Sequence, residues 1–188
     1  MKRTMLVVAF GIGMLAAAAV SARAGDPLPG QVDFGTFSPP GSKGEFVEIN
    51  VPANLIALVA RFVEKQDPEV AQLLNRLQLV HVSVIGLNDE NRADLEKRAQ
   101  KVRKDLEGKG WERIVKVLKQ DQDVGIYLKT QGKDTVQGLA VVVLDGKQQA
   151  IFVNIVGDIK PEQLALLGDR LHIEPLKKIG QMTEKAEQ

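Results

Sequence analysis

Apolar and polar residues alternate along several short segments of the chain, a spacing typical of β-strands with one covered face. This spacing predicts strands over residues 45–51, 79–87, 111–118, 124–129, 136–144 and 148–156. Residues 139–144 are an unbroken apolar run, so we expect a central strand there, covered on both faces. Short polar connections, among them Asp121-Gln122-Asp123 and Asp145-Gly146, predict that the last four strands form an antiparallel meander. The Asp-Gly pair favours a type I′ turn in which both residues are central.

Apolar residues three and four positions apart predict helices elsewhere. Pro52 is expected to open the first helix, because the first helical N–H has no partner to lose. Asp67 and Pro68 mark the start of a second, short helix. A long charged helix is predicted over residues 89–107, and a final helix from Pro161. The apolar positions of the first, third and final helices are Leu55, Leu58, Val59 and Phe62; Leu95, Ala99, Val102 and Leu106; and Leu164, Leu166, Leu167 and Leu171. The predicted fold class is α+β, a mainly antiparallel sheet with a four-stranded C-terminal meander and helices packed on the sheet.

The first 24 residues follow the pattern of a secretory signal peptide. Lys2 and Arg3 are followed by an apolar run over residues 5–20 and then by the small-residue pattern Ala22-Arg23-Ala24. We expect cleavage between Ala24 and Gly25. The run is shorter than the roughly 20 residues of a membrane-spanning helix, which makes an uncleaved anchor the less favoured alternative. The protein is therefore predicted to be periplasmic or secreted, with no stable membrane anchor after cleavage.

The rest of the chain divides into three parts. Residues 25–44 are rich in proline and glycine and are predicted to be a linker, although Val32, Phe34 and Phe37 leave open a short arm docked on the domain. Residues 45–179 are expected to form a single α+β domain, and residues 180–188 a flexible tail.

Composition excludes several classes of site. The chain contains no cysteine, which rules out disulfides, thiolate metal sites, cysteine nucleophiles and the lipidated cysteine of a lipoprotein. Residues 1–24 hold three basic side chains and no acidic one, so of the 25 basic and 24 acidic side chains the mature chain keeps 22 and 24. A net charge of −2 does not favour nucleic acid, whose binding rests on clustered Lys and Arg.

Side chains that carry common chemistry are few and scattered. His81 and His172 are the only histidines, and their separation predicts a structural or surface role for each rather than a shared metal site. Ser42 falls in the predicted linker and Ser83 in a strand, outside any hydrolase motif. Acidic residues such as Asp158 fall in turns or on helix faces. We therefore assign no catalytic, cofactor-binding or metal-ligating residue and expect no cofactor.

Two groups of residues admit a binding role beside a structural one. The aromatic residues Trp111, Tyr127 and Phe152 on predicted strands could line a groove, but we interpret them as core. The long charged helix carries a basic face that we interpret as solvated. Its members are Lys97, Arg98, Lys101, Arg103 and Lys104.

Four segments carry a resemblance to a known family. These are Gly44-Glu45-Phe46-Val47-Glu48-Ile49-Asn50-Val51, Trp111-Glu112-Arg113-Ile114-Val115, Ile126-Tyr127-Leu128 and Asn154-Ile155-Val156-Gly157-Asp158-Ile159. Together they resemble the bacterial domain of unknown function 4252. The resemblance implies an exported protein and supplies no catalytic residue. Family members often look like lipoproteins, and the missing cysteine makes this chain a departure that favours a soluble periplasmic protein.

These observations favour a non-catalytic binding or interaction module of the bacterial envelope, with an envelope protein or a small ligand as its partner. The alternative is a small hydrolase that depends on carboxylates alone, such as a glycoside hydrolase. That alternative requires a deep cleft with two inward-facing carboxylates.

Overall fold

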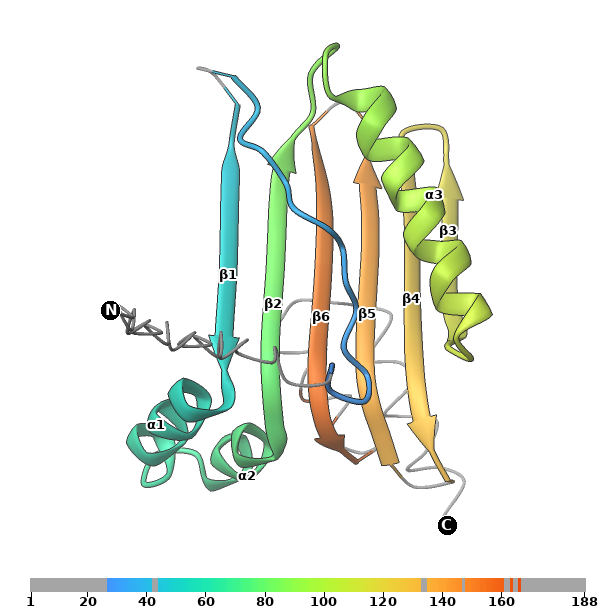
Figure 1. The fold of residues 1–188 in the computed structure, drawn as a ribbon. Coiled ribbons are helices and arrows are strands. Elements are labelled where there is room, and N and C mark those ends of the chain that lie inside the picture. Colours follow the sequence, from blue (N-terminus) through green and yellow to red (C-terminus); the bar gives the residue numbers. More distant parts are fainter. Residues whose placement is uncertain are drawn as a thin grey trace, which may run out of the picture.

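The computed structural model describes residues 27–41, 44–132, 135–146, 148–160, 163 and 166. Six strands form one sheet in the order β1-β2-β6-β5-β4-β3, and every neighbouring pair is antiparallel (Figure 1). The strands are β1 (Phe46–Pro52), β2 (Leu77–Gly86), β3 (Glu112–Lys119), β4 (Gln122–Gln131), β5 (Thr135–Asp145) and β6 (Gln149–Ile159). The α+β class and the C-terminal meander of β3 to β6 are confirmed, and the apolar run of β5 lies in the interior of the sheet as predicted.

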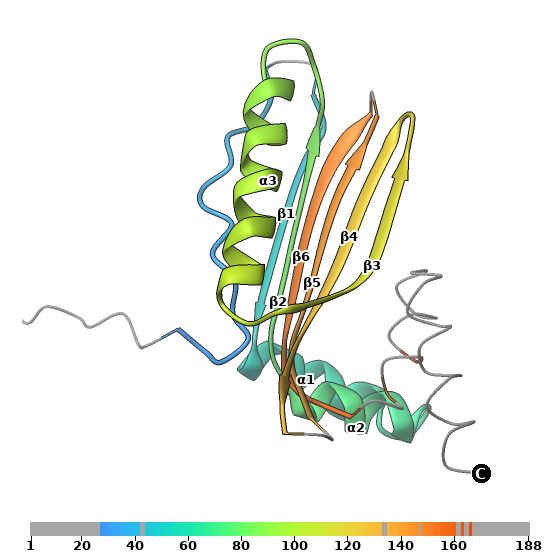
Figure 2. The same cartoon turned by 90° about the vertical axis from the view of Figure 1, so that its right-hand side faces the viewer.

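Within the described ranges, three complete helices flank the sheet. They are α1 (Ala53–Val63), α2 (Pro68–Arg76) and α3 (Arg92–Gly108). Figure 2 shows α3 along one face, with α1 and α2 at one end of the sheet. The predicted cap of α2 is confirmed, since the Asp67 carboxylate accepts a hydrogen bond from the Val70 N–H at 3.1 Å. Pro52 is not the first helical residue: it pairs with Leu79 as the last residue of β1 and caps α1.

The hairpin between β5 and β6 differs from its predicted turn. Asp145 pairs with Gln149, and the Gln148 N–H donates to the Asp145 carbonyl at 2.8 Å, so three residues form the loop instead of two. The longer loop pairs Phe152 with Val142, and paired residues share a face of the sheet. A two-residue turn at Asp145-Gly146 would shift the pairing of β6 with β5 by an odd number of residues. Phe152 would then lie on the other face of the sheet, outside the core in which it is buried. The φ of Gly146 is nevertheless positive, at 36°, as the predicted type I′ turn also requires.

The two faces of the sheet bury separate clusters. The face under α3, here called the arm face, holds Trp111, Tyr127 and Phe152, and all three are buried. Their interpretation as core is confirmed. The opposite face, here called the open face, is aliphatic and includes Ile56 of α1 and Leu73 of α2.

Residues 27–41 form an arm across the arm face beside α3 (Figure 1). Phe34 and Phe37 are buried, and their rings lie 5.5 and 4.9 Å from that of Phe152. The fully buried Asn154 holds the arm by its main chain: its Oδ1 accepts from the Val32 N–H at 2.9 Å, and its Nδ2 donates to the Gly30 carbonyl at 3.0 Å. The docked arm that the sequence left open is the arrangement observed.

Several predictions lie outside the described residues. These concern Ser42, the start of the final helix at Pro161, His172 and the tail. Of the predicted final helix, the structure describes Gln163 and Leu166, both in helical conformation, and Leu166 packs against the open-face cluster. In the part of the chain that is described, no helix combines the length and apolar character needed to cross a bilayer.

Candidate functional site

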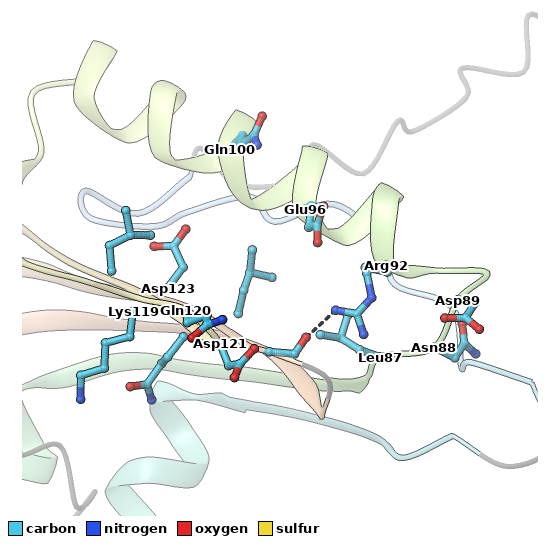
Figure 3. Close-up of a pocket in the computed structure, with 14 residues that line it drawn as sticks. Leu87, Asn88, Asp89, Arg92, Glu96, Gln100, Lys119, Gln120, Asp121 and Asp123 are labelled. Carbon is cyan, nitrogen blue, oxygen red and sulfur yellow. Dashed lines mark hydrogen bonds between the residues drawn. The ribbon is translucent and has the colours of Figure 1, made fainter.

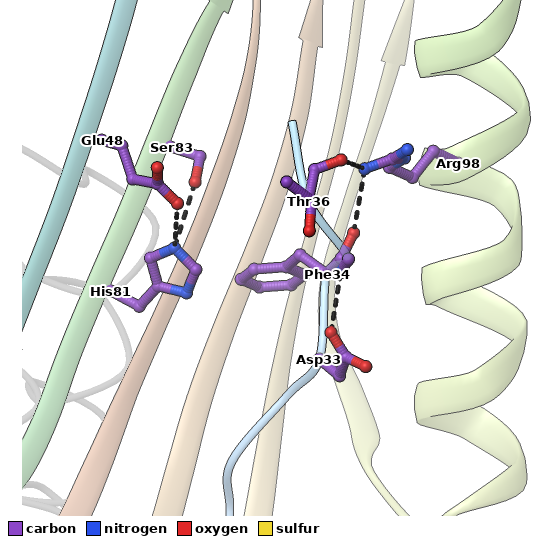
Figure 4. A network of polar contacts seen from close by, with 8 residues as sticks. Asp33, Phe34, Thr36, Glu48, His81, Ser83 and Arg98 are labelled. Atoms are coloured by element: carbon purple, nitrogen blue, oxygen red, sulfur yellow. Dashed lines mark hydrogen bonds and ion pairs between the residues drawn. The ribbon is translucent and has the colours of Figure 1, made fainter. Parts of the chain in front are cut away.

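A polar cluster lies beneath the arm. Ser83 Oγ is 3.2 Å from His81 Nε2, and Glu48 Oε1 is 3.6 Å from the same nitrogen (Figure 4). A Ser-His-acid relay needs the carboxylate on the other ring nitrogen, so this cluster is not arranged for acyl transfer. Ser83 is fully buried, and the ring of Phe34 lies 5.8 Å from the imidazole. His81 thus joins β1, β2 and the arm.

A cleft lies between the first half of α3 and the loops that join β3 to β4 and β5 to β6. It has a volume of about 840 Å³ and is lined by charged side chains of both signs (Figure 3). The charged residues are Asp89, Arg92, Glu96, Lys119, Asp121 and Asp123. Among the described residues, no group of three or more His, Asp or Glu side chains is placed to hold a metal ion.

The carboxylates of this cleft do not form an isolated acid pair. Asp123, predicted to lie in a turn, is a residue of β4, and Arg103 donates to its carboxylate at 2.5 Å. Lys119 pairs with Gln122, which leaves only two residues for the turn. Asp89, Glu96 and Asp121 are exposed to solvent, so the cleft does not remove water from them. This arrangement gives little support to carboxylate-dependent hydrolysis, which uses two opposed carboxyl groups around a bound sugar.

The basic face of α3 is not uniformly solvated. Arg98 donates to the Thr36 carbonyl at 2.6 Å, and its guanidinium lies 4.7 Å from the centre of the Phe37 ring. Arg103 is bound to Asp123. Two of the five basic residues therefore attach α3 to the arm and the sheet, while Lys101 forms an exposed pair with Asp105 at 3.6 Å.

Exposed apolar side chains occur along β1 and on α1. We call this group the β1–α1 patch, and its residues are Val47, Ile49, Leu55, Leu58, Val59 and Phe62. The four apolar residues of α1 that the sequence pattern picked out at helical spacing are all exposed, and Phe62 is 73% exposed. α1 buries Ile56 and Ala60 instead. Its apolar positions therefore extend beyond the side that packs on the sheet, and an exposed apolar helix surface of this kind often marks a binding site.

Beside this patch, β1 is an edge strand of the described sheet, and some of its main-chain groups point away from β2. The Gly86 N–H donates to the Glu45 carbonyl at 2.7 Å. Along β1, residues whose main-chain groups point toward β2 alternate with residues whose groups point away, and this bond places Glu45 among the first. Both main-chain groups of a residue in an antiparallel pair point the same way, so those of Phe46, Glu48 and Asn50 point outward. Within the described part of the chain, no strand pairs with this outer side. Pro52, which has no N–H, occupies the next outward position.

The opposite edge of the sheet is protected. β3 has an irregularity between Arg113 and Val115 and exposes Lys116 and Lys119. Bulges and lysines are common devices that prevent edge-to-edge pairing. The register of β1 with β2 is unbroken from Phe46 to Pro52. Of the two edges, β1 is the one open to pairing.

Comparison with known proteins places the chain by its sequence. No curated protein and no solved structure matched it. Residues 41–167 match the profile of a family described as Domain of unknown function (DUF4252). The matched residues contain every strand of the sheet, all three helices and both edges. The chain belongs to the domain of unknown function 4252 family.

Proposed function

We propose that this protein is a non-catalytic interaction module, exported to the periplasm, that binds an extended protein segment along the outer side of β1. The observation that carries the proposal is the exposed β1–α1 patch beside an unprotected edge strand. The N-terminal pattern ending at Ala24, together with the absence of cysteine, supports release as a soluble envelope protein.

Strand addition uses both features of this edge. Outward main-chain groups of Phe46, Glu48 and Asn50 offer hydrogen bonds to an added strand, and these bonds do not depend on the partner's sequence. Specificity comes from alternate side chains. An added strand places every second side chain beside Val47 and Ile49 on the open face, and so we expect apolar residues at those positions.

The α1 helix extends this surface beyond the edge of the sheet. In Figure 1 it lies at the lower left, outside the end of β1. Its exposed Leu55, Val59 and Phe62 are separated by four and three residues and therefore lie on one side of the helix. Burying a fully exposed large apolar side chain contributes about 1.5–3 kcal/mol. Leu55 and Val59 are about half exposed and Phe62 is 73% exposed, so each can contribute part of that amount beside the main-chain bonds.

Site-specific photo-crosslinking in the periplasm tests the proposal. A photoreactive residue at Ile49 is expected to form adducts, whereas one at Leu118 is not. Leu118 is the matched control, because it is 70% exposed and apolar but lies on the protected edge β3.

A second variant separates strand addition from simple apolar contact. Asn50→Pro removes an outward N–H and leaves the bonds between β1 and β2 intact. We expect the adducts at Ile49 to disappear in this variant while the melting temperature is retained. Equal adducts at Ile49 and Leu118, or adducts at Ile49 that persist in Asn50→Pro, would contradict the proposal.

A further inference from the structure

We infer that the segment added to β1 is β1 of a second copy of this chain, so that two sheets join edge to edge about a two-fold axis. This inference rests on the proposed function and names its partner. A strand that pairs with an open edge must itself have a free edge, and β1 is the unprotected edge among the described strands.

The sequence of β1 is complementary to itself in one antiparallel register. β1 spans Phe46–Pro52, and its middle residue is Ile49. When Ile49 is placed opposite Ile49 of the second copy, all residues of the two strands overlap. The outward main-chain groups of Glu48 then meet those of Asn50 in the second copy, and this is the geometry of a hydrogen-bonded pair.

Side chains favour the same register. Glu48 faces Asn50 of the second copy, so a carboxylate meets an amide that can donate to it. A shift that lowers the sum of paired positions by two places Glu48 opposite Glu48, where like charges repel. On the open face, Ile49 meets Ile49 and Val47 meets Val51 of the second copy. These are non-hydrogen-bonded pairs, whose side chains approach most closely.

The two-fold axis also places part of the second copy against the β1–α1 patch. An axis perpendicular to the sheet keeps both open faces on the same side. Because the strands run antiparallel, the start of β1 in the second copy lies at the end of β1 in the first, where α1 projects beyond the edge (Figure 1). The exposed side of α1 therefore lies near Val47 of the second copy.

The absence of cysteine makes the register measurable. In a chain with no other thiol, Ile49→Cys places one thiol opposite its own copy. A non-hydrogen-bonded pair has a Cα separation of about 4.5 Å, which is within the range of a disulfide. Mild oxidation of the purified processed protein is expected to give a disulfide dimer with Ile49→Cys and none with Leu118→Cys.

Two further measurements make the test specific. Val47→Cys mixed with Val51→Cys is expected to form a mixed disulfide, while neither variant alone forms a disulfide-linked dimer. Light scattering is expected to show twice the chain mass for the unmodified protein and the single-chain mass for Asn50→Pro. These results together support pairing through β1 in the stated register.

Other outcomes overturn the inference. Equal disulfide formation at Ile49 and Leu118 indicates random collision and refutes it. A single-chain mass for the unmodified protein, with no disulfide at Ile49, also refutes self-pairing. If photo-crosslinking at Ile49 then captures a different protein and Asn50→Pro abolishes it, the proposed function stands and only its partner is wrong.

Discussion

Substitution of Asn154 by alanine tests whether one buried amide holds the arm on the sheet. Its side chain makes three hydrogen bonds: it accepts from the Val32 N–H at 2.9 Å and donates to the carbonyls of Gly30 at 3.0 Å and Leu139 at 3.2 Å. A net hydrogen bond contributes about 0.5–1.5 kcal/mol, so the loss of three lowers the free energy of unfolding by about 3 kcal/mol.

This loss is large enough to measure by thermal unfolding. In a protein of this size, 1 kcal/mol corresponds to about 2–4 °C in melting temperature, so we expect a decrease of about 6–12 °C. Asn54→Ala is the matched control, because Asn54 is exposed on α1. A surface substitution of this kind is expected to change stability by at most about 0.5 kcal/mol.

Limited proteolysis shows whether the lost stability belongs to the arm. Chymotrypsin cleaves after aromatic residues, and in the folded protein Phe34 and Phe37 are buried. We expect Asn154→Ala to be cut at these positions faster than the unmodified protein, with the sheet still protected. One hydrogen bond of about 1 kcal/mol corresponds to about 2–4 °C. If Asn154→Ala melts within about 1 °C of the unmodified protein and its arm is cut no faster, Asn154 does not hold the arm.

Three further predictions concern export, a turn and metal. N-terminal sequencing of the periplasmic form should begin at Gly25, and recovery of the full-length chain in the membrane would show that the signal peptide is not removed. Gly146→Val should destabilise the fold by about 1 kcal/mol or more, because the residue has positive φ and an added Cβ lies 2.6 Å from the Asp121 carbonyl oxygen. Gly132→Val is its control: it has positive φ but no neighbouring atom within 4 Å, so a loss equal to that at Gly146 would exclude a steric contribution. EDTA should leave the melting temperature unchanged, and a decrease on chelation, with metal released, would reveal a metal that stabilises the fold.

Local patterns predicted most of the elements correctly. The alternating segments located all six strands, and the Asp67-Pro68 pair located the start of α2, because these signals depend on neighbours within a few residues. Turn length was less accessible. The loop after Asp145 has three residues because Phe152 must face the arm-side core, and that requirement comes from residues distant in sequence.

The candidate site shows the same division. The apolar spacing along α1 identified a helix and its apolar positions, yet Ile56 and Ala60 are buried while Leu58 and Phe62 are exposed. The apolar positions of α1 extend over more of its circumference than the core can cover, so the pattern alone does not select the side that is buried. That choice depends on where α2 and β2 lie, and it produced the surface that we propose binds a partner.

By itself, the sequence determined the fold class, the meander, the lack of thiol chemistry and the pattern of a signal peptide, all of which depend on composition or on short-range periodicity. Tertiary structure alone decided that the arm is docked and that β1 is an open edge. The arm is held by Asn154, 122 positions from Val32, and the edge exists because, among the described strands, β1 pairs with β2 on one side only. The apolar residues Val32, Phe34 and Phe37 permit docking but do not decide it, and β1 has no local sign of an open edge, since contacts between distant residues depend on how the whole sheet is assembled.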